Sequence, residues 1–331
     1  MPELSRIFTA LAEAPGEPAA LATLVRVEGS SYRRPGARLL VLASGLRVGS
    51  ISGGCLEDDV VLRAQRVLAG GTPETAVYDT TSENDLVWGV GLGCQGVVHI
   101  FIERLPVIRP RWINVLDDNL RARRDTALAI IHGGDGTLGT CLDKDLPAGI
   151  KSLDIFQEKI SAPPALTIFG AGEDACPLVQ LAKEVGWHVT VADSRPAYAT
   201  TARFPGADQV VIAPAKEAAG LLAHDHSGFA VVMTHRYAED LELLRRLLPH
   251  PLAYLGVLGP HKRTARLIAQ LRTEGLSPDA AMLARLHAPI GLDLGGNTPE
   301  TVALAIVAEI QCRFTARNPI HLRDRTTPIH G

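Results

Sequence analysis

The chain has 331 residues, of which 46% are hydrophobic and 21% are charged, and its formal net charge at pH 7 is −3. This composition is typical of a globular protein with room for two domains, and the charge gives no electrostatic case for binding nucleic acid. We find neither a signal-peptide pattern nor a run of about 18 apolar residues, so we expect a cytoplasmic protein with no membrane partner.

The first half of the chain begins with a predicted helix over residues 4–14, followed by predicted strands over 22–27 and 38–43. The link between the strands reads GSSYRRPG, and it combines hydroxyl groups, arginines and glycines. Such a loop is suited to bind an oxyanion, through Ser31 and Arg33, but a surface hairpin connection has the same composition. The sequence leaves both interpretations open.

A second glycine-rich stretch, GSISGGCLE, leads into a predicted helix that continues through 60–68. Cys55 lies near the start of this helix, where the helix dipole stabilises a thiolate, so it is the best candidate for a reactive or ligand-contacting thiol. The alternative is a small residue packed beneath a glycine turn. The five cysteines of the chain show no zinc-like spacing, which favours free thiols: Cys55, Cys94, Cys141, Cys176 and Cys312.

A third glycine-rich stretch, GVGLGCQG, carries Cys94 between strands predicted over 75–79 and 97–102. Two glycine-rich loops with one cysteine each suggest a shared concave site, in which backbone approaches a ligand closely at Gly53, Gly54 and Gly93. The bland alternative is a pair of tight turns.

The remainder of the first half reads as a helix-like segment over 106–125 and strands over 127–131, 138–142 and 150–157. A Pro163-Pro164 pair then precedes a new strand, which is typical of a domain boundary. We therefore expect an N-terminal domain over 1–160 and a C-terminal domain over 161–331.

The C-terminal domain opens with LTIFGAGEDACPLVQLAKEVGWHVTVADSR, which predicts a strand, a glycine turn, a helix and a second strand. Gly170 and Gly172 let backbone N–H groups approach a phosphate at the positive end of the helix. Asp193 follows Gly172 by 193 − 172 = 21 positions, where a carboxylate meets ribose hydroxyls. Arg195 pairs either with an additional phosphate or only with solvent.

Two carboxylates directly after the turn, Glu173 and Asp174, are unusual for a phosphate site. They favour the helix dipole but would repel a pyrophosphate seated in the turn, so the identity of the ligand stays open. We expect Asp174 to cap the helix, with Pro177 in its first turn.

Beyond Asp193, strands predicted over 209–213, 229–234 and 253–259 alternate with helices predicted over 215–223, 238–248 and 262–271. The fold class is therefore α/β, with a C-terminal Rossmann-like, doubly wound parallel sheet and an N-terminal, strand-rich α/β domain. Ligands bind beyond the carboxyl ends of such strands, which adds His235 and Lys262 to the candidate site. A structural role is the alternative for His235. Thr298 is expected to cap the last helix, with Pro299 at its first position.

These motifs resemble, in order and over nearly the whole chain, those of the XdhC/CoxI family. They are GSSYRRPGARLLV, GSISGGCLE and GLGC-x-G in the first half, and IFGAG, VTVADSRPAYAT, VVMTH, YLGVLG and PIGLDLGGNTPETVALAIVAEI in the second. The resemblance implies a maturation factor that binds the molybdenum cofactor, protects it during sulfuration by a cysteine desulfurase and delivers it to an apo molybdenum hydroxylase of the xanthine dehydrogenase type. It implies a homodimeric cofactor chaperone rather than a turnover enzyme.

The resemblance assigns family positions to Gly53, Gly54 and Cys55 in the first cysteine loop, Gly93 and Cys94 in the second, and Gly170, Gly172 and Asp193 in the Rossmann unit. The sequence departs from the family pattern at Gln95, at Glu173-Asp174 and at Gly295-Gly296-Asn297. The change at Glu173 leaves the ligand of the turn open among a pterin phosphate (molybdopterin), a cytosine dinucleotide form of the cofactor and a separate nicotinamide nucleotide.

Two rival functions remain. One is an NAD(P)-dependent oxidoreductase that uses the Rossmann unit, with His235 as acid or base, although the first half offers no paired acid and base residues. The other is an interaction scaffold with a vestigial fold.

Overall fold

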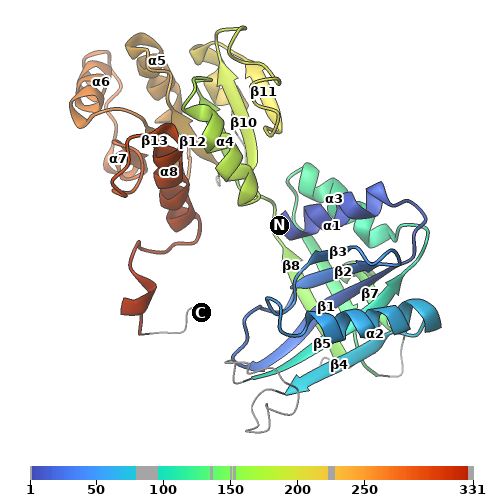
Figure 1. Ribbon diagram of the computed structural model, residues 1–331. Coiled ribbons are helices and arrows are strands. Elements are labelled where there is room, and N and C mark those ends of the chain that lie inside the picture. The colour runs from blue at the N-terminus through green and yellow to red at the C-terminus, as the bar shows by residue number, and fades with distance from the viewer. Residues whose placement is uncertain are drawn as a thin grey trace. The chain divides into compact units, whose positions relative to one another are not determined.

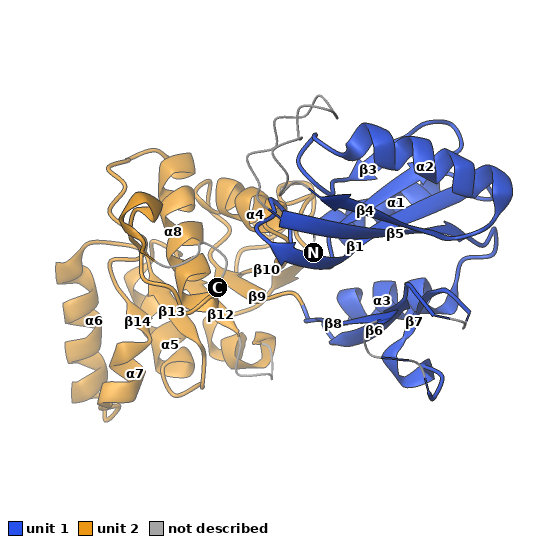
Figure 2. Ribbon diagram, turned by 90° about the horizontal axis from the view of Figure 1, so that it is seen from below, with its two compact units in different colours: residues 1–162 blue, residues 163–331 orange. Residues whose placement is uncertain are grey.

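The computed structural model describes residues 2–79, 96–134, 137–149, 151, 154–222 and 228–326 (Figure 1). The chain divides into two compact units, Met1–Ala162 and Pro163–Gly331 (Figure 2). Within the described ranges, every helix is too short or too polar to span a bilayer.

Unit 1 is built on two antiparallel sheets. The larger sheet has the strand order β3-β2-β1-β5-β4 and the smaller one has the order β7-β6-β8. The strands are β1 (Ala19–Gly29), β2 (Arg38–Leu42), β3 (Arg47–Gly49), β4 (Glu74–Asp79), β5 (Gly96–Leu105), β6 (Thr126–Ile131), β7 (Gly139–Leu142) and β8 (Ile155–Ile160). The helices are α1 (Pro2–Glu13), α2 (Glu57–Gly70) and α3 (Arg111–Arg121), with a 3-10 turn η2 (Asp143–Asp145).

The larger sheet of unit 1 is covered on both faces because β1 is apolar on both sides. Its residues Ala20, Ala22 and Leu24 pack in one cluster with the apolar stripe of α2, whereas Ala19 and Leu21 pack with α1, α3 and the smaller sheet. Side chains of a strand alternate between faces, so one continuous apolar run serves both layers.

The last strand of unit 1 differs from its prediction over 150–157. Strand β8 pairs residue by residue with β6, from Thr126 opposite Ile160 to Ile131 opposite Ile155. This pairing draws Lys159 and Ile160, which read as linker in the sequence, into the ladder, since register is fixed by the partner strand.

Unit 2 is a parallel six-stranded sheet with the order β11-β10-β9-β12-β13-β14. Its strands are β9 (Ala165–Phe169), β10 (His188–Asp193), β11 (Gln209–Ile212), β12 (Phe229–Val232), β13 (Tyr254–Val257) and β14 (Leu286–His287). The helices are α4 (Ala175–Glu184), α5 (Tyr237–Leu247), α6 (His261–Thr273), α7 (Ala280–Ala284) and α8 (Pro299–Phe314), with 3-10 segments η4 (Ala215–Leu221) and η5 (Leu322–Asp324). The chain starts at the centre with β9 and winds outward in both directions, which confirms the predicted α/β, Rossmann-like class.

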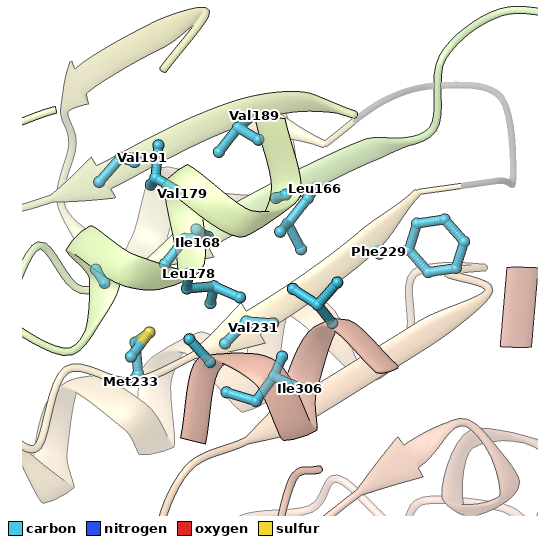
Figure 3. Close-up of a cluster of buried hydrophobic side chains, with 14 of the residues drawn as sticks. Leu166, Ile168, Leu178, Val179, Val189, Val191, Phe229, Val231, Met233 and Ile306 are labelled. Atoms are coloured by element: carbon cyan, nitrogen blue, oxygen red, sulfur yellow. The ribbon is translucent and has the colours of Figure 1, made fainter. Parts of the chain in front are cut away.

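Both faces of the parallel sheet carry helices. Helices α4 and α8 cover one face through a cluster that includes Leu178, Val179 and Ile306 (Figure 3). Helices α5 and α6 and the segment η4 cover the other face. The segment η4 is a 3-10 helix rather than the α-helix predicted over 215–223, as expected for a short stretch that contains Gly220.

The predicted start of the last helix is confirmed. Thr298 is the N-cap of α8, its hydroxyl accepts the backbone N–H of Thr301, and Pro299 follows at the first helical position. The neighbouring Thr301 hydroxyl accepts the backbone N–H of Thr298 at 3.0 Å, which completes a reciprocal cap.

Candidate functional site

Three sequence motifs of unit 1 meet at one end of the larger sheet. Strands β1 and β3 both run antiparallel to β2, so the loops that follow them leave the sheet at the same end. Strand β5 is antiparallel to β1 and begins there, with Gly96 opposite Gly29. The topology therefore brings the GSSYRRPG loop and the GSISGGCLE loop together with the end of the GVGLGCQG stretch.

Glycines allow these segments to approach one another. A Cβ added at Gly53 would lie 2.7 Å from Cε1 of Tyr32, and a Cβ at Gly96 would lie 2.2 Å from the carbonyl oxygen of Ser30. Both contacts are closer than a side chain allows. Tyr32, which sequence reasoning did not single out, thus lies over the glycine that precedes Gly54-Cys55, and its ring remains largely exposed.

Cys55 is exposed, whereas Cys141, Cys176 and Cys312 are partly buried, among the cysteines that the structure describes. Burial raises the pKa of both the Cys141 and the Cys176 thiols. The alternative of a residue packed beneath a glycine turn is therefore wrong for Cys55. This exposed position makes Cys55 the most accessible thiol of the described chain.

The predicted relation of Cys55 to the following helix needs correction. Helix α2 begins at Glu57 with Leu56 at the N-cap, so Cys55 lies before the cap. The first turn contains three carboxylates, Glu57, Asp58 and Asp59, which meet the positive end of the helix themselves. The helix dipole is thus not the feature that distinguishes Cys55. Cys55 is distinguished by its exposure and by the glycine-rich backbone around it.

The other predicted cysteine loop is described only at its end. Gly93 and Cys94 lie outside the described residues, as does Gln95, and Gly96 is the first residue of β5. The hypothesis of a site shared by two cysteines therefore stays a prediction.

Ser31 and Arg33 are engaged within unit 1. The Ser31 hydroxyl donates to the backbone carbonyl of Arg33, and Nη2 of Arg33 lies 2.7 Å from Oε2 of Glu3 in α1. The other Glu3 oxygen accepts the backbone N–H of Arg38 at 3.0 Å. An oxyanion would have to compete with the carboxylate of Glu3 for the guanidinium of Arg33.

In unit 2, the glycine turn follows β9 at the point where the chain order reverses between β9 and β12. Gly170 has φ +118°, and a Cβ there would lie 2.5 Å from the carbonyl oxygen of Met233 and 2.9 Å from the nitrogen of Thr234. A Cβ at Gly172, in contrast, would meet no described atom within 4 Å. Gly170 is therefore required by the close approach of two strand ends, and only Gly172 leaves backbone open to a ligand.

Asp193 lies at the end of β10, as predicted, but its oxygens already have partners. One oxygen accepts the backbone N–H of Ala171 and Nη2 of Arg195, each at 2.8 Å, and the other accepts the backbone N–H (2.8 Å) and Nε (2.9 Å) of Arg195. Burial raises the pKa of Asp193, but the hydrogen bonds from Arg195 and Ala171 outweigh burial and lower the pKa to about 2. The carboxylate thus fastens the glycine turn to β10, and ribose hydroxyls would have to displace these donors.

Arg195 contacts two neighbouring side chains of unit 2, Asp193 and Tyr198. Its guanidinium is held by Asp193 and lies 3.8 Å from the ring centroid of Tyr198. Arg203 lies 5.3 Å from the same ring. Two guanidinium groups therefore share one aromatic ring beside the glycine turn.

The two carboxylates after the turn both have basic partners. Glu173 lies 2.7 Å from Nη2 of Arg203, and Asp174 lies 3.0 Å from Nε2 of His235. Asp174 occupies the N-cap position of α4 but makes no capping hydrogen bond, so the predicted cap is wrong in its chemistry. The reason is that His235, which follows β12, binds the carboxylate across the ends of the two central strands.

The remaining predicted residues lie at the same edge of the sheet. His235 has φ +60°, a strained value for a residue with a Cβ, and its side chain is exposed. Lys262 is exposed in the first turn of α6, which follows β13. Next to it, Arg263 binds the fully buried Asp240 of α5, which ties the starts of two helices together. The edge therefore carries basic side chains at the ends of two neighbouring strands, β12 and β13.

Comparison with known proteins covers both units. The family described as the XdhC Rossmann domain matches residues 166–310, and the XdhC and CoxI family matches residues 12–79. A protein of Bacillus subtilis (strain 168), named as a probable subunit of xanthine dehydrogenase, is 36% identical over 317 residues, which are 89% of this chain and 92% of that protein. The "Molybdenum cofactor insertion chaperone PaoD" of Escherichia coli (strain K12) is 25% identical over 295 residues, which are 89% of this chain and 83% of that protein. A crystal structure described as a xanthine dehydrogenase from Bacillus halodurans matches with a TM-score of 0.81 and 31% identity, over 96% of this chain and 97% of that one.

Proposed function

The chain belongs to the XdhC and CoxI family, as its ordered motifs predicted, and on this premise we propose that it is a maturation factor that handles the molybdenum cofactor. The relative named as a cofactor insertion chaperone matches 89% of the chain, so the likeness includes both units. Another relative is named as part of a xanthine dehydrogenase. We propose that the client is an apo molybdenum hydroxylase of that type.

The observation that carries this proposal in the structure is the exposed thiol of Cys55 on its glycine loop. Thiolates are soft ligands, suited to a metal centre that is itself bound by sulfur. The ring of Tyr32 lies over Gly53, which is close to Cys55 in the chain, and the ring remains largely exposed. A flat heterocycle would therefore have an aromatic surface to contact. This end of unit 1 thus offers sulfur and an aromatic face.

Unit 2 offers a different chemistry and is considered by itself. The backbone at Gly172 is open, and the side chains of His235 and Lys262 are exposed at the ends of β12 and β13. We propose that this edge, taken by itself, binds a phosphate group such as that of molybdopterin or of its cytosine dinucleotide form. The ion pair of Glu173 with Arg203 reduces the repulsion that this carboxylate would otherwise exert on a phosphate, and Asp174 is occupied by the ring of His235.

Three further properties belong to the proposal and follow from the family resemblance. The cofactor is protected while a cysteine desulfurase adds its sulfur, the protein acts as a homodimer, and the exchange takes place in the cytoplasm. The protein then acts as a carrier of cargo and not as a catalyst of turnover.

An NAD(P)-dependent oxidoreductase is the second candidate, because the strand order of unit 2 and its Gly-x-Gly turn suit a dinucleotide. The position of Asp193 disfavours it. A carboxylate that receives four hydrogen bonds from Ala171 and Arg195 has little capacity left for ribose hydroxyls.

The test is to purify the full chain under anaerobic, reducing conditions from cells that make the cofactor, and to measure bound molybdenum and the mass spectrum of released small molecules. We expect a pterin or its cytosine dinucleotide with the wild type. The Cys55→Ala variant should lose at least about tenfold of it. The Cys176→Ala variant is the control, because that thiol is partly buried in unit 2.

Three results would contradict parts of the proposal. Absence of molybdenum and pterin from the wild-type protein would remove the cofactor-handling role. Release of NAD(P) with no pterin would favour the oxidoreductase. Equal losses in the Cys55→Ala and Cys176→Ala variants would remove the special role of Cys55.

A further inference from the structure

We propose that Glu57 is a positioning residue whose carboxylate holds the loop of residues 50–56 in the shape that presents Cys55. The functional part of this inference rests on the proposed function, in which Cys55 contacts the cofactor. The positioning part stands on the geometry of the loop alone.

The loop wraps around the Glu57 carboxylate, which accepts five backbone N–H groups and two hydroxyl groups. Oε1 accepts the N–H groups of Ile51 (3.0 Å), Ser52 (2.8 Å) and Gly53 (3.1 Å) and the hydroxyl of Ser50 (2.8 Å), while Oε2 accepts the N–H groups of Gly54 (2.8 Å) and Leu56 (3.2 Å) and the hydroxyl of Ser52. Donors on both sides of Cys55 therefore point at the same carboxylate. The backbone of Cys55 is fixed between them.

The ionised state of Glu57 is the one that these donors favour. Burial raises the pKa of its carboxyl group, but the hydrogen bonds from Ser52, Ser50 and Ile51 outweigh burial and bring the pKa to about 2. The group is therefore fully charged at neutral pH, and hydrogen bonds to a charged acceptor are the stronger kind. A glutamine amide at this position would turn a donor group toward other donors.

The loop needs such an anchor because only Ile51 and Leu56, at its two ends, pack against the core. Gly53 has φ +80° and Gly54 has φ +119°, conformations that favour glycine, and both residues are exposed. Ordering a residue costs backbone entropy, which small exposed residues cannot recover by burial. The bonds to Glu57 supply that ordering, and the ring of Tyr32 adds one contact at Gly53.

If Glu57 only stabilised the start of α2, its effect would be confined to the first turn of that helix. The neighbouring residue separates this role from the positioning of the loop. Asp58 is the next residue, carries the same charge and lies in the same turn. Its carboxylate is exposed and binds Arg47 at 2.9 Å, away from the loop. Asp58→Asn therefore changes the charge at the helix start without touching the loop, and it is the matched control for Glu57→Gln.

The experiment uses full-length protein without added cofactor and has two readouts. The first is peptide-resolved hydrogen exchange of the 50–56 amides against those of α2. The second is the alkylation rate of Cys55 by iodoacetamide, with Cys312 as the internal reference. For Glu57→Gln we expect faster exchange in the loop, preserved protection in α2 over 60–70, and a Cys55 rate changed by at least about threefold. Asp58→Asn should leave both readouts at the wild-type value.

A second variant covers the case in which Glu57→Gln unfolds unit 1. Ser52→Ala removes one hydroxyl donor to the carboxylate, together with the hydroxyl oxygen that accepts the N–H of Leu56 at 2.8 Å. It leaves the carboxylate and all of its backbone donors in place. It should produce a smaller change of the same kind, confined to the loop. Wild-type loop protection and a wild-type Cys55 rate in both Glu57→Gln and Ser52→Ala would overturn the inference.

Cofactor retention separates this inference from the proposed function. If Cys55→Ala loses the cofactor while Glu57→Gln keeps both the cofactor and the wild-type thiol rate, the role of Glu57 is refuted and the proposed function stands. If loop exchange and thiol rate change in Glu57→Gln but neither variant loses cofactor, the positioning role stands and the role of Cys55 in cargo binding is refuted.

Discussion

Replacing Gly170 by alanine should destabilise unit 2, although the sequence motif suggests that this glycine serves a ligand. At φ +118° a residue with a Cβ is strained by about 1–3 kcal/mol. The new Cβ would also lie 2.5 Å from the carbonyl oxygen of Met233, and relieving that contact costs about 1–3 kcal/mol of overpacking. The sum is roughly 2–6 kcal/mol, a large fraction of the stability of a domain.

The matched control is Gly172→Ala, two residues along the same turn. A Cβ at Gly172 would meet no described atom within 4 Å, and its φ is not in the left-handed range. We expect the free energy of unfolding to stay within about 0.5 kcal/mol of the wild type. If backbone at Gly172 contacts the cargo, the same variant should weaken cofactor retention.

The assay is native-state hydrogen exchange resolved by peptide. Amides of β9 and β12 should exchange roughly thirtyfold faster or more in Gly170→Ala, because about 2 kcal/mol corresponds to such a factor. Amides of β1 and β5 in unit 1 serve as an internal reference and should not change. Wild-type protection of β9 and β12 in Gly170→Ala, or equal losses in both alanine variants, would refute the reasoning.

The remaining predictions concern stability at acid pH and the N-cap residues of α4 and α8. The pKa of Asp193 is lowered to about 2, so its contribution to stability is complete above about pH 4 and is lost as the pH falls toward 2. Urea midpoints of the wild type should fall over this window by the equivalent of about 2 kcal/mol more than those of Asp193→Asn, and parallel curves would contradict this. Thr298→Ala should lower the free energy of unfolding by about 1 kcal/mol, because the hydroxyl caps α8. Asp174→Asn should lower it by less than about 0.5 kcal/mol, because the pair of Asp174 with His235 is screened by water. Thermal unfolding measures both, and a larger loss in Asp174→Asn would show that this carboxylate stabilises α4.

Much of unit 2 could be predicted because its signals are local. The apolar run before Gly170, the helical spacing after it and the strand that ends at Asp193 each depend on a few neighbouring residues, and the structure has all three as predicted. The cap of α8 was equally predictable, since Thr298 and Pro299 act on the turn directly beside them.

The partners of polar side chains were not predictable in this way. Asp174 has the right type and position for a helix cap, yet it binds His235, which is 61 positions away in the chain. Local rules cannot weigh a competitor that only the fold brings close. Arg195 is a different case. It was expected to meet phosphate or water, whereas it binds Asp193, two residues before it, and lies over Tyr198, so both partners were within the range of local reasoning.

In unit 1, the sequence does contain a signal for the role of Glu57. Glu57 follows directly after a glycine-rich loop at the start of a helix, and a carboxylate there has many N–H groups within reach. The expectation that the helix dipole acts on Cys55 is wrong because the helix starts at Glu57. No local pattern indicates how Tyr32 comes to lie over Gly53, because that contact depends on the pairing of β1, β2 and β3.

If Cys55 contacts the cofactor as proposed, the Glu57 carboxylate inside the loop of residues 50–56 has a consequence for the release of the cofactor. A receptor segment that orders only around its guest must melt again before the guest leaves, and that step slows dissociation. Here the loop has an internal anion as its template, so we expect its shape to be set before a ligand binds. Such preorganisation removes the ordering cost from association and the melting step from dissociation. If the protein is the cofactor carrier proposed above, we expect it to bind the cofactor firmly and still exchange it quickly with the next protein.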